Sequence, residues 1–210
     1  MAQLTLTTFL SLDGVMQAPG GRDEDRSDGF EYGGWLVPFA DEDMGRFMTE
    51  VFGRVDAFLL GRRTYEIFAS YWPQVTDPDD PVASRLNNLP KHVVSRTLGK
   101  AEWHNSHLVT GDLVEEVTRL KEGPGREIQV HGSGRLAQSL ITHGLVDEYH
   151  LLVFPVFLGK GRRLFPDGGT PTAFELTGHR TTKAGATIQT YRPTGRARFG
   201  TFGLPDEGRG

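Results

Sequence analysis

Two short apolar runs in this chain end at a glycine and pass directly into a segment with the pattern of a helix. Residues 55 to 60 read VDAFLL, reach Gly61 and continue as RRTYEIFASY, and residues 127 to 131 read EIQVH, reach Gly132 and continue as SGRLA. A short apolar run is typical of a buried strand, and a strand that leads at once into a helix is typical of a parallel sheet with crossover helices. The pattern predicts an α/β fold.

Other segments continue the same alternation. Residues 3 to 10, QLTLTTFL, predict an opening strand, and a helix beginning at Asp41 carries an apolar stripe of Met44, Phe47, Met48, Val51 and Phe52. Similar patterns predict a short helix at 82 to 88, a strand at 91 to 95, a helix capped by Asp112, a helix at 135 to 143, a strand at 146 to 156, and a hairpin of residues 173 to 179 and 186 to 191. We therefore expect a mixed, mainly parallel sheet with helices on both faces and an antiparallel C-terminal hairpin.

The length of the chain favours one domain. It has 210 residues, enough for one well-packed core and too few for two domains of ordinary size. We assign the domain to residues 1 to 193 and a flexible tail to residues 194 to 210, which are rich in glycine and aperiodic. Residues 19 to 34 are rich in Gly, Asp, Glu and Arg, and we expect them to form a long, mobile surface loop, a feature that is often functional.

Charge and cysteine content exclude several classes of function. The net charge of -4 and the lack of a Lys/Arg block argue against nucleic acid and membrane surfaces as partners, so we expect small molecules or other protein chains. The lack of cysteine excludes disulfides, thiolate nucleophiles and Cys-ligated metals. The N-terminal segment lacks the pattern of a targeting peptide, and we expect a cytoplasmic protein.

Both glycine junctions are candidates for phosphate binding. A turn between a strand end and a helix N-terminus offers unpaired backbone N–H groups and the positive end of the helix dipole. The alternative is a glycine that only permits a tight bend.

Two more specific interpretations of the second junction fail. Gly132, Gly134 and Ala137 match a dinucleotide-binding fingerprint, but the motif lies late in the chain and lacks the acidic residue at the end of the next strand. Ser133 lacks the flanking glycines of a hydrolase nucleophile, because His131 and Arg135 stand where glycine would be needed.

Arginines beside hydroxyl groups point to NADPH. Arg62 and Arg63 follow one strand end, and Ser95 and Arg96 follow another. A guanidinium can bind a ribose 2′-phosphate through two parallel charge-assisted hydrogen bonds, which favours NADPH over NADH. The alternative is that these arginines are solvated surface charges.

The histidines do not suggest a metal site. His104 and His107 lie in a polar stretch, AEWHNSH, without a carboxylate in place, and surface positions explain them better. His131 and His150 lie in apolar strands and could be core groups, although His131 at the glycine turn could also face a ligand.

Four motifs together resemble the dihydrofolate reductase superfamily, and especially the branch of the C-terminal reductase domain of the bifunctional riboflavin biosynthesis deaminase/reductase. They are the opening strand with SLDGVM at 11 to 16, LLGRRTYE at 59 to 66, VHGSG at 130 to 134, and VDEYH at 146 to 150 continuing through PVFLGKGRRLF at 155 to 165. The resemblance covers the chain from about Leu4 to Tyr191.

The resemblance implies an eight-stranded, mainly parallel sheet with an antiparallel last strand, and NADPH lying across the strand ends. It also implies a homodimer. The residues that it implies for the cofactor are Gly61, Arg62, Arg63, Thr64, Ser95 and Arg96 around the adenosine phosphates, His131, Gly132, Ser133, Gly134, Arg135 and Leu136 at the pyrophosphate turn, and Asp13, Gly14 and Val15 near the nicotinamide.

The sequence predicts an NADPH-dependent reductase of a small heterocyclic or carbonyl substrate, similar to a riboflavin precursor or a pterin. Asp41 is the candidate catalytic carboxylate, because related enzymes hold a pterin with a carboxylate at the first helix, although Asp41 is equally explained as a partner of the helix dipole. The alternative function is a non-catalytic nucleotide- or flavin-binding module on the same fold.

Overall fold

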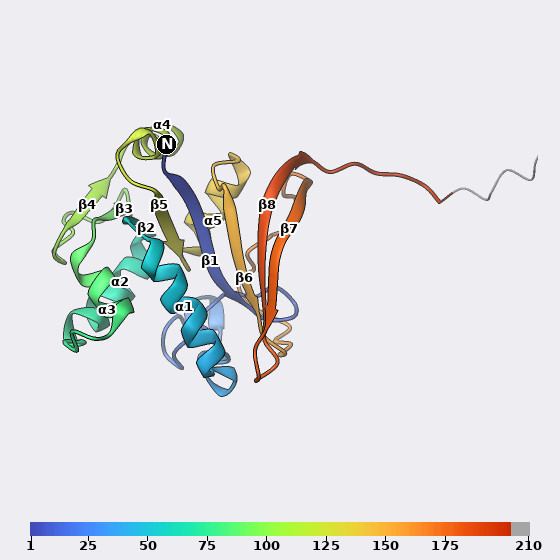
Figure 1. Ribbon diagram of the computed structural model, residues 1–210, viewed down its shortest axis with the longest axis horizontal. Coiled ribbons are helices and arrows are strands. Elements are labelled where there is room, and N and C mark those ends of the chain that lie inside the picture. Colours follow the sequence, from blue (N-terminus) through green and yellow to red (C-terminus); the bar gives the residue numbers. More distant parts are fainter. Residues whose placement is uncertain (203–210) are drawn as a thin grey trace, which may run out of the picture.

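The protein is built around one eight-stranded sheet. The computed structural model describes residues 1 to 202. The strands are β1 (Gln3–Leu10), β2 (Ala57–Gly61), β3 (Lys91–Val94), β4 (Ser106–Val109), β5 (Glu127–His131), β6 (Glu148–Val153), β7 (Thr172–Thr181) and β8 (Thr187–Arg196). Their order across the sheet is β4-β3-β2-β5-β1-β6-β8-β7 (Figure 1).

The pairing of the strands confirms the predicted mixed sheet. The pairs β1/β5, β1/β6, β2/β5, β2/β3 and β3/β4 are all parallel. β8 pairs antiparallel with both β6 and β7, so β8 is the one strand of this sheet that runs against the others. The carboxyl ends of β1 to β5 therefore lie along the same edge of the sheet, where α/β proteins place their ligands.

Helices cover both faces of the sheet, which confirms the three-layer fold. α4 (Leu113–Glu122) and α5 (Gly134–Thr142) pack on one face, against a core that includes Leu4, Leu6 and Val130. α1 (Glu42–Arg54), α2 (Arg62–Tyr71) and α3 (Pro81–Asn88) pack on the other face, against strand residues such as Phe58 and Leu60. Within residues 1 to 202, no helix has the length and apolar character needed to cross a membrane.

The C-terminal elements differ from the predicted bounds. β6 ends at Val153, three residues before the predicted end, because Pro155 has no N–H group to continue the ladder. The hairpin strands are longer than predicted, and β8 continues to Arg196, which pairs with Thr172. Residues 194 to 196, which the sequence analysis assigned to the tail, therefore belong to the sheet, and the part of the predicted tail from residue 203 lies outside the described residues.

One strand lacks a signal in the sequence. β4 lies at the edge of the sheet and pairs only with β3, so it has little apolar surface to bury. Its residues SHLV include the exposed His107, and the surrounding polar stretch hides the strand pattern.

Candidate functional site

A large cleft lies along the carboxyl ends of the parallel strands. Its volume is about 1280 Å³, above the range of about 300 to 1,000 Å³ that is usual for the site of one small ligand. The cleft is lined by the ends of β1, β2, β3, β4 and β5, by the first turns of α2 and α5, and by the loop that follows β1. The cleft is therefore larger than one small ligand usually needs.

The two glycine turns predicted from the sequence meet in this cleft and are hydrogen-bonded to each other. The amide of Gly61 donates to Ser133 Oγ at 3.0 Å, and the amide of Ser133 donates to Thr64 Oγ1 at 2.9 Å. Ser133 Oγ in turn donates to the carbonyl of His131 at 2.9 Å. Ser133 thus joins the start of α2 to the start of α5 and fixes the distance between these two helix ends.

The second turn needs an unusual backbone. Gly132 and Ser133 both have a φ of 53°, in the left-handed region. Glycine adopts this backbone conformation without a steric penalty, whereas Ser133 pays one because it has a Cβ atom. The hydrogen bonds of Ser133 to both neighbouring segments compensate for that penalty, which explains a serine at this position.

The N-termini of the helices at the cleft differ from the others. α1, α3 and α4 each begin with an aspartate, Asp41, Asp80 or Asp112, whose side chain accepts hydrogen bonds from backbone amides of the first turn. In residues 1 to 202 no side chain caps the first turn of α2 or α5 in this way. Because the first-turn amides of a helix have no partner within the helix, these two ends remain able to bind an anion.

Arg62, Ser95 and Arg96 lie together at one end of the cleft. Arg62 reaches from α2 to the loop after β3, where it donates to Thr97 Oγ1 at 2.8 Å, and it also pairs with Glu66. Ser95 Oγ accepts from the amides of Thr97 and Leu98 and so turns that loop. All three predicted residues line the cleft, with the two arginine side chains exposed.

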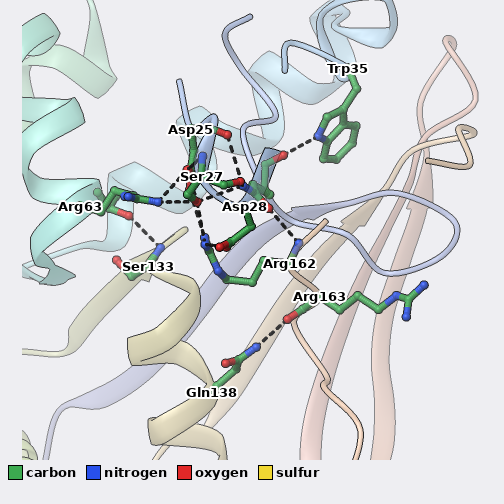
Figure 2. A network of polar contacts seen from close by, with 11 residues as sticks. Asp25, Ser27, Asp28, Trp35, Arg63, Ser133, Gln138, Arg162 and Arg163 are labelled. Atoms are coloured by element: carbon green, nitrogen blue, oxygen red, sulfur yellow. Dashed lines mark hydrogen bonds and ion pairs between the residues drawn. The ribbon is translucent and has the colours of Figure 1, made fainter. Parts of the chain in front are cut away.

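Arg63 points elsewhere, toward a polar network that sequence reasoning missed. Its guanidinium donates to Asp25 at 2.6 Å and to Ser27 at 2.8 Å, and Arg162 donates to the same two side chains at 3.0 and 3.1 Å. Figure 2 shows both arginines directed at Asp25 and Ser27. Burial alone would raise the pKa of Asp25, but the hydrogen bonds from Ser27, Arg162 and Arg63 outweigh it and hold this pKa well below its usual range.

This network anchors the loop that follows β1. Phe30 and Trp35 are buried in the core between the loop and the sheet, and Trp35 Nε1 donates to the carbonyl of Gln17 at 2.8 Å (Figure 2). The side chain of Gln17 donates to the carbonyls of Asp25 and Ser27. Residues 19 to 34 form the predicted loop, and many of them are exposed, but Phe30 anchors the loop in the core and its inner side forms a wall of the cleft.

Glu24 is a second residue of this wall that the sequence analysis did not single out. It lines the cleft, and its Oε2 accepts hydrogen bonds from the amides of Gly20 and Gly21 at 2.7 and 3.0 Å. Burial raises the pKa of Glu24 even though those two amides favour the charged form. The charged composition of the loop was visible in the sequence, but nothing in its pattern separates Glu24 from the neighbouring acidic residues.

Two buried polar residues of the cleft are Thr7 and His131. Both line it, and they are only 2% and 6% exposed. The ring of His131 stacks on Phe52 with centroids 4.7 Å apart, and its Nε2 lies 2.9 Å from Gln129 Oε1. Burial lowers the pKa of His131 to about 3, so the ring is neutral at physiological pH.

Asp41 lies apart from the cleft. It is the N-cap of α1, where one carboxylate oxygen accepts from the amide of Met44 and the other from the amide of Ala184. These two bonds lower the pKa of Asp41, that from Met44 most. Asp41 is not among the residues that line the cleft.

Asp13, Gly14 and Val15 form the support of the loop rather than its cleft surface. The carboxylate of Asp13 accepts from the amides of Leu158 and Gly159, and Val15 is fully buried. These hydrogen bonds, with one from Ser11, lower the pKa of Asp13 against the opposing effect of burial. The cleft surface that follows β1 begins at Met16.

Comparison with known proteins identifies the family of this chain. Protein YyaP of Bacillus subtilis (strain 168), which is uncharacterized, is 28% identical over 195 residues, 92% of this chain and 96% of YyaP. A protein of Shewanella sp. PV-4 named for riboflavin biosynthesis has a similar structure, with a TM-score of 0.70, 23% identity, and coverage of 92% of this chain and 99% of that one. The diaminohydroxyphosphoribosylaminopyrimidine deaminase/5-amino-6-(5-phosphoribosylamino)uracil reductase of Thermotoga maritima matches with a TM-score of 0.62 and 16% identity, over 91% of this chain and 56% of that one.

These two solved structures show a shared fold. The sequence profile of the RibD C-terminal domain matches residues 2–188, nearly the whole described chain. The chain belongs to the RibD C-terminal domain family, as the four motifs predicted.

Proposed function

We propose that this protein is an NADPH-dependent reductase of a small heterocyclic or carbonyl compound. The observation that carries the proposal is the pair of glycine turns, which are joined through Ser133 and present two helix N-termini without side-chain caps to one cleft. Reductase-like relatives of the family support an enzymatic role. The volume of the cleft, about 1280 Å³, accommodates a cofactor and a substrate together.

The residues at the turns suit the phosphates of NADPH. The first-turn amides of α2 and α5 would hold the diphosphate, because helix N-termini stabilise negative charge. Arg62 and Arg96 would hold the 2′-phosphate at the exposed end of the cleft, where Ser95 shapes the loop. When bound, the nicotinamide supplies a hydride, and the task of the protein is to align it with the acceptor, exclude water and deliver a proton.

Within this proposal we assign proton delivery to Glu24. Four carboxyl groups line the cleft, those of Glu24, Asp25, Asp28 and Glu66, and burial raises the pKa of Glu24. Asp25 is held ionised by its arginine partners. Hydrogen bonds from Gly20 and Gly21 occupy Oε2 of Glu24, which leaves Oε1 to carry the proton.

Titration with NADPH and NADH tests the cofactor. Saturable binding with a clear preference for NADPH is expected, because a 2′-phosphate adds charge-assisted hydrogen bonds. Failure of both cofactors to bind would overturn the proposal, and equal affinities would remove the arginine cluster from it. Saturable NADPH binding without reduction of any cyclic imine or ketone would favour the non-catalytic alternative.

Glu24→Gln tests the proton donor. With an acceptor that the wild-type protein reduces, we expect turnover to fall by about 100-fold or more, with the Kd for NADPH unchanged, because general acid catalysis contributes on that scale. Asp23→Asn, at an exposed neighbouring position, is the matched control and should leave turnover unchanged. Wild-type turnover in Glu24→Gln would assign the proton to another group or to water.

A further inference from the structure

One buried hydroxyl group in the cleft has no partner. Thr7 Oγ1 is fully buried and makes no hydrogen bond within residues 1 to 202, while Thr7 itself is 2% exposed and lines the cleft. A buried hydroxyl without a partner is costly, and most such groups in native proteins are satisfied. Thr7 is therefore a candidate for a group that is satisfied by a ligand.

The strands on either side of Thr7 bring histidines to the same level of the sheet. Thr7 is in register with His131 on β5 and with His150 on β6. Both ring nitrogens of His150 already have partners, since Nε2 lies 3.1 Å from Arg54 and Nδ1 lies 3.2 Å from Thr190 Oγ1. His131 is the neighbour that also lines the cleft.

A chain of hydrogen bonds fixes which nitrogen of His131 carries the proton. Gln129 Nε2 donates to the carbonyl of Val51 at 2.7 Å and to Glu127 at 2.8 Å, so Gln129 Oε1 must be the acceptor for His131. His131 Nε2 is then the protonated nitrogen, and Nδ1 carries a lone pair. At the far end of this chain of hydrogen bonds, Arg54 Nε lies 3.1 Å from Glu127 Oε2.

We propose that Thr7 and His131 form a recognition site for the edge of a cyclic lactam, in which His131 Nδ1 accepts a ligand N–H and Thr7 Oγ1 donates to the adjacent C=O. Neighbouring strands lie about 4.8 Å apart, so two side chains in register can engage adjacent atoms of one ring. The apolar side chains of Phe9, Met48 and Phe52, which also line the cleft, would contact the faces of that ring. This proposal rests on the proposed reductase function only because it identifies the class of substrate that the reductase would take.

The neutral state of His131 supports this assignment. Burial keeps the ring uncharged well below physiological pH, so the lone pair of Nδ1 remains available. A ligand that offers only acceptors could satisfy Thr7 but would leave Nδ1 without a donor. The site therefore favours a ligand with an N–H group, and methylation of that ligand nitrogen should weaken binding.

The probe for this site is 2-pyridone, with N-methyl-2-pyridone as its matched control. Histidine labelled with ¹⁵N reports the ring nitrogens, and the signals of His131 are assigned by their loss in His131→Gln. We expect 2-pyridone to shift the Nδ1 resonance and to bind the wild-type protein about tenfold more tightly than the methylated probe. Lack of a shift with 2-pyridone, or equal binding of the two probes, would overturn the proposal.

Variants of two threonines on the same strand separate recognition from folding. Thr7→Val should weaken 2-pyridone binding about tenfold without lowering stability, because it deletes a hydroxyl that has no partner, whereas Thr7→Ser should retain binding. Thr5→Val removes a hydroxyl that donates to Glu127 at 2.9 Å outside the cleft, so it should lower stability and leave 2-pyridone binding unchanged. Wild-type binding in Thr7→Val would exclude Thr7 from recognition.

These measurements need no cofactor, so they are independent of the proposed reductase activity. If the protein binds 2-pyridone through His131 Nδ1 but does not bind NADPH, the proposed recognition site stands and the proposed reductase function is wrong. If the protein binds NADPH but does not distinguish 2-pyridone from N-methyl-2-pyridone, the proposed reductase function stands and the proposed recognition site is wrong.

Discussion

The two ends of the cleft differ in the chemical groups that line them and in their exposure to solvent. At the exposed end, backbone amides of two helix N-termini lie near Arg62, whose side chain is 45% exposed, and Arg96. At the buried end, Thr7 and His131 lie beneath α1 at 2% and 6% exposure, and a chain of hydrogen bonds through Gln129 orients the histidine. Charge attracts a ligand at the first end, and the placement of single donors and acceptors selects it at the second.

The two ends should therefore respond differently to amino-acid substitution. Exposed charges are screened by water and salt, so substitutions at the exposed end should alter ligand binding more than stability. A buried polar group that has partners depends on them, so substitution of His131 at the buried end should alter stability and its pH dependence as well.

The largest expected effect is on acid stability at the buried end. Burial, with a smaller effect of His150, lowers the pKa of His131 from 6.5 to about 3. Between these values only the unfolded chain binds the proton, so the stability contributed by the neutral ring is complete above pH 6.5 and is lost as the pH falls toward 3. The slope is about 1.4 kcal/mol per pH unit, or about 4 kcal/mol over three units.

Urea unfolding of His131→Gln over a series of pH values measures this contribution. The free energy of unfolding of this variant should depend less steeply on pH, by the equivalent of about one proton. His104→Gln, at an exposed position, should keep the wild-type slope of this free energy against pH. Identical slopes for His131→Gln and the wild type would mean that the ring is charged in the folded protein, which would remove the contrast between the two ends.

At the exposed end, Arg62→Glu should weaken NADPH binding by about 100-fold, since it replaces a charge-assisted contact by repulsion. NADH, which lacks the 2′-phosphate, should lose much less affinity. Arg119→Glu, an exposed position on α4 away from the cleft, is the control for overall charge. Equal losses for the two cofactors would show that Arg62 does not contact the 2′-phosphate.

Asp25→Asn tests the loop that forms the wall of the cleft. Loss of the charged partner of Arg63 and Arg162 should lower stability at pH 7 by about 2 kcal/mol. Because the pKa of Asp25 is lowered in the folded protein, this stability is present above the ordinary carboxyl pKa and is lost as the pH falls through the folded value. The difference between variant and wild type should therefore narrow in acid, as measured by urea unfolding.

Asp28→Asn serves as the control for that loop. Asp28 is 82% exposed and lies 3.6 Å from Arg162, so its loss should cost less than about 0.5 kcal/mol. Equal destabilisation by the two changes would mean that general charge, rather than the buried carboxylate, holds the loop.

Apart from the control variants, the smallest effect is expected where the two glycine turns join. Ser133→Ala should cost about 1.5 kcal/mol, because the amide of Gly61 and the carbonyl of His131 each lose a partner. Ser133→Gly loses the same hydroxyl but relieves the left-handed backbone, so it should cost about 0.5 kcal/mol less. A reversed order of the two melting temperatures would show that the conformation of this turn is not strained.

The candidate site was predictable from the sequence to different extents at its two ends. Gly61 and Gly132 lie between a strand and a helix that are both encoded locally, so the turns could be placed before their contact was known. Nothing local indicates that Arg63 pairs with Asp25, 38 residues away, and not with a cofactor phosphate. The carboxylate of Asp41 was assigned by position along the chain, while the structure brings Glu24 to the cleft instead.

The sequence by itself determined the alternation of strands and helices, the mixed sheet and the two glycine turns, because periodicity and turn residues act over a few neighbours. Only the tertiary structure decided which polar groups meet. Thr7, His131 and Glu24 come from three separate segments, and only the packing of these segments and of α1 brings them to one cleft and buries Thr7 and His131. The edge strand β4 shows the same limit, since a strand with one neighbour buries too little surface to leave a pattern in its sequence.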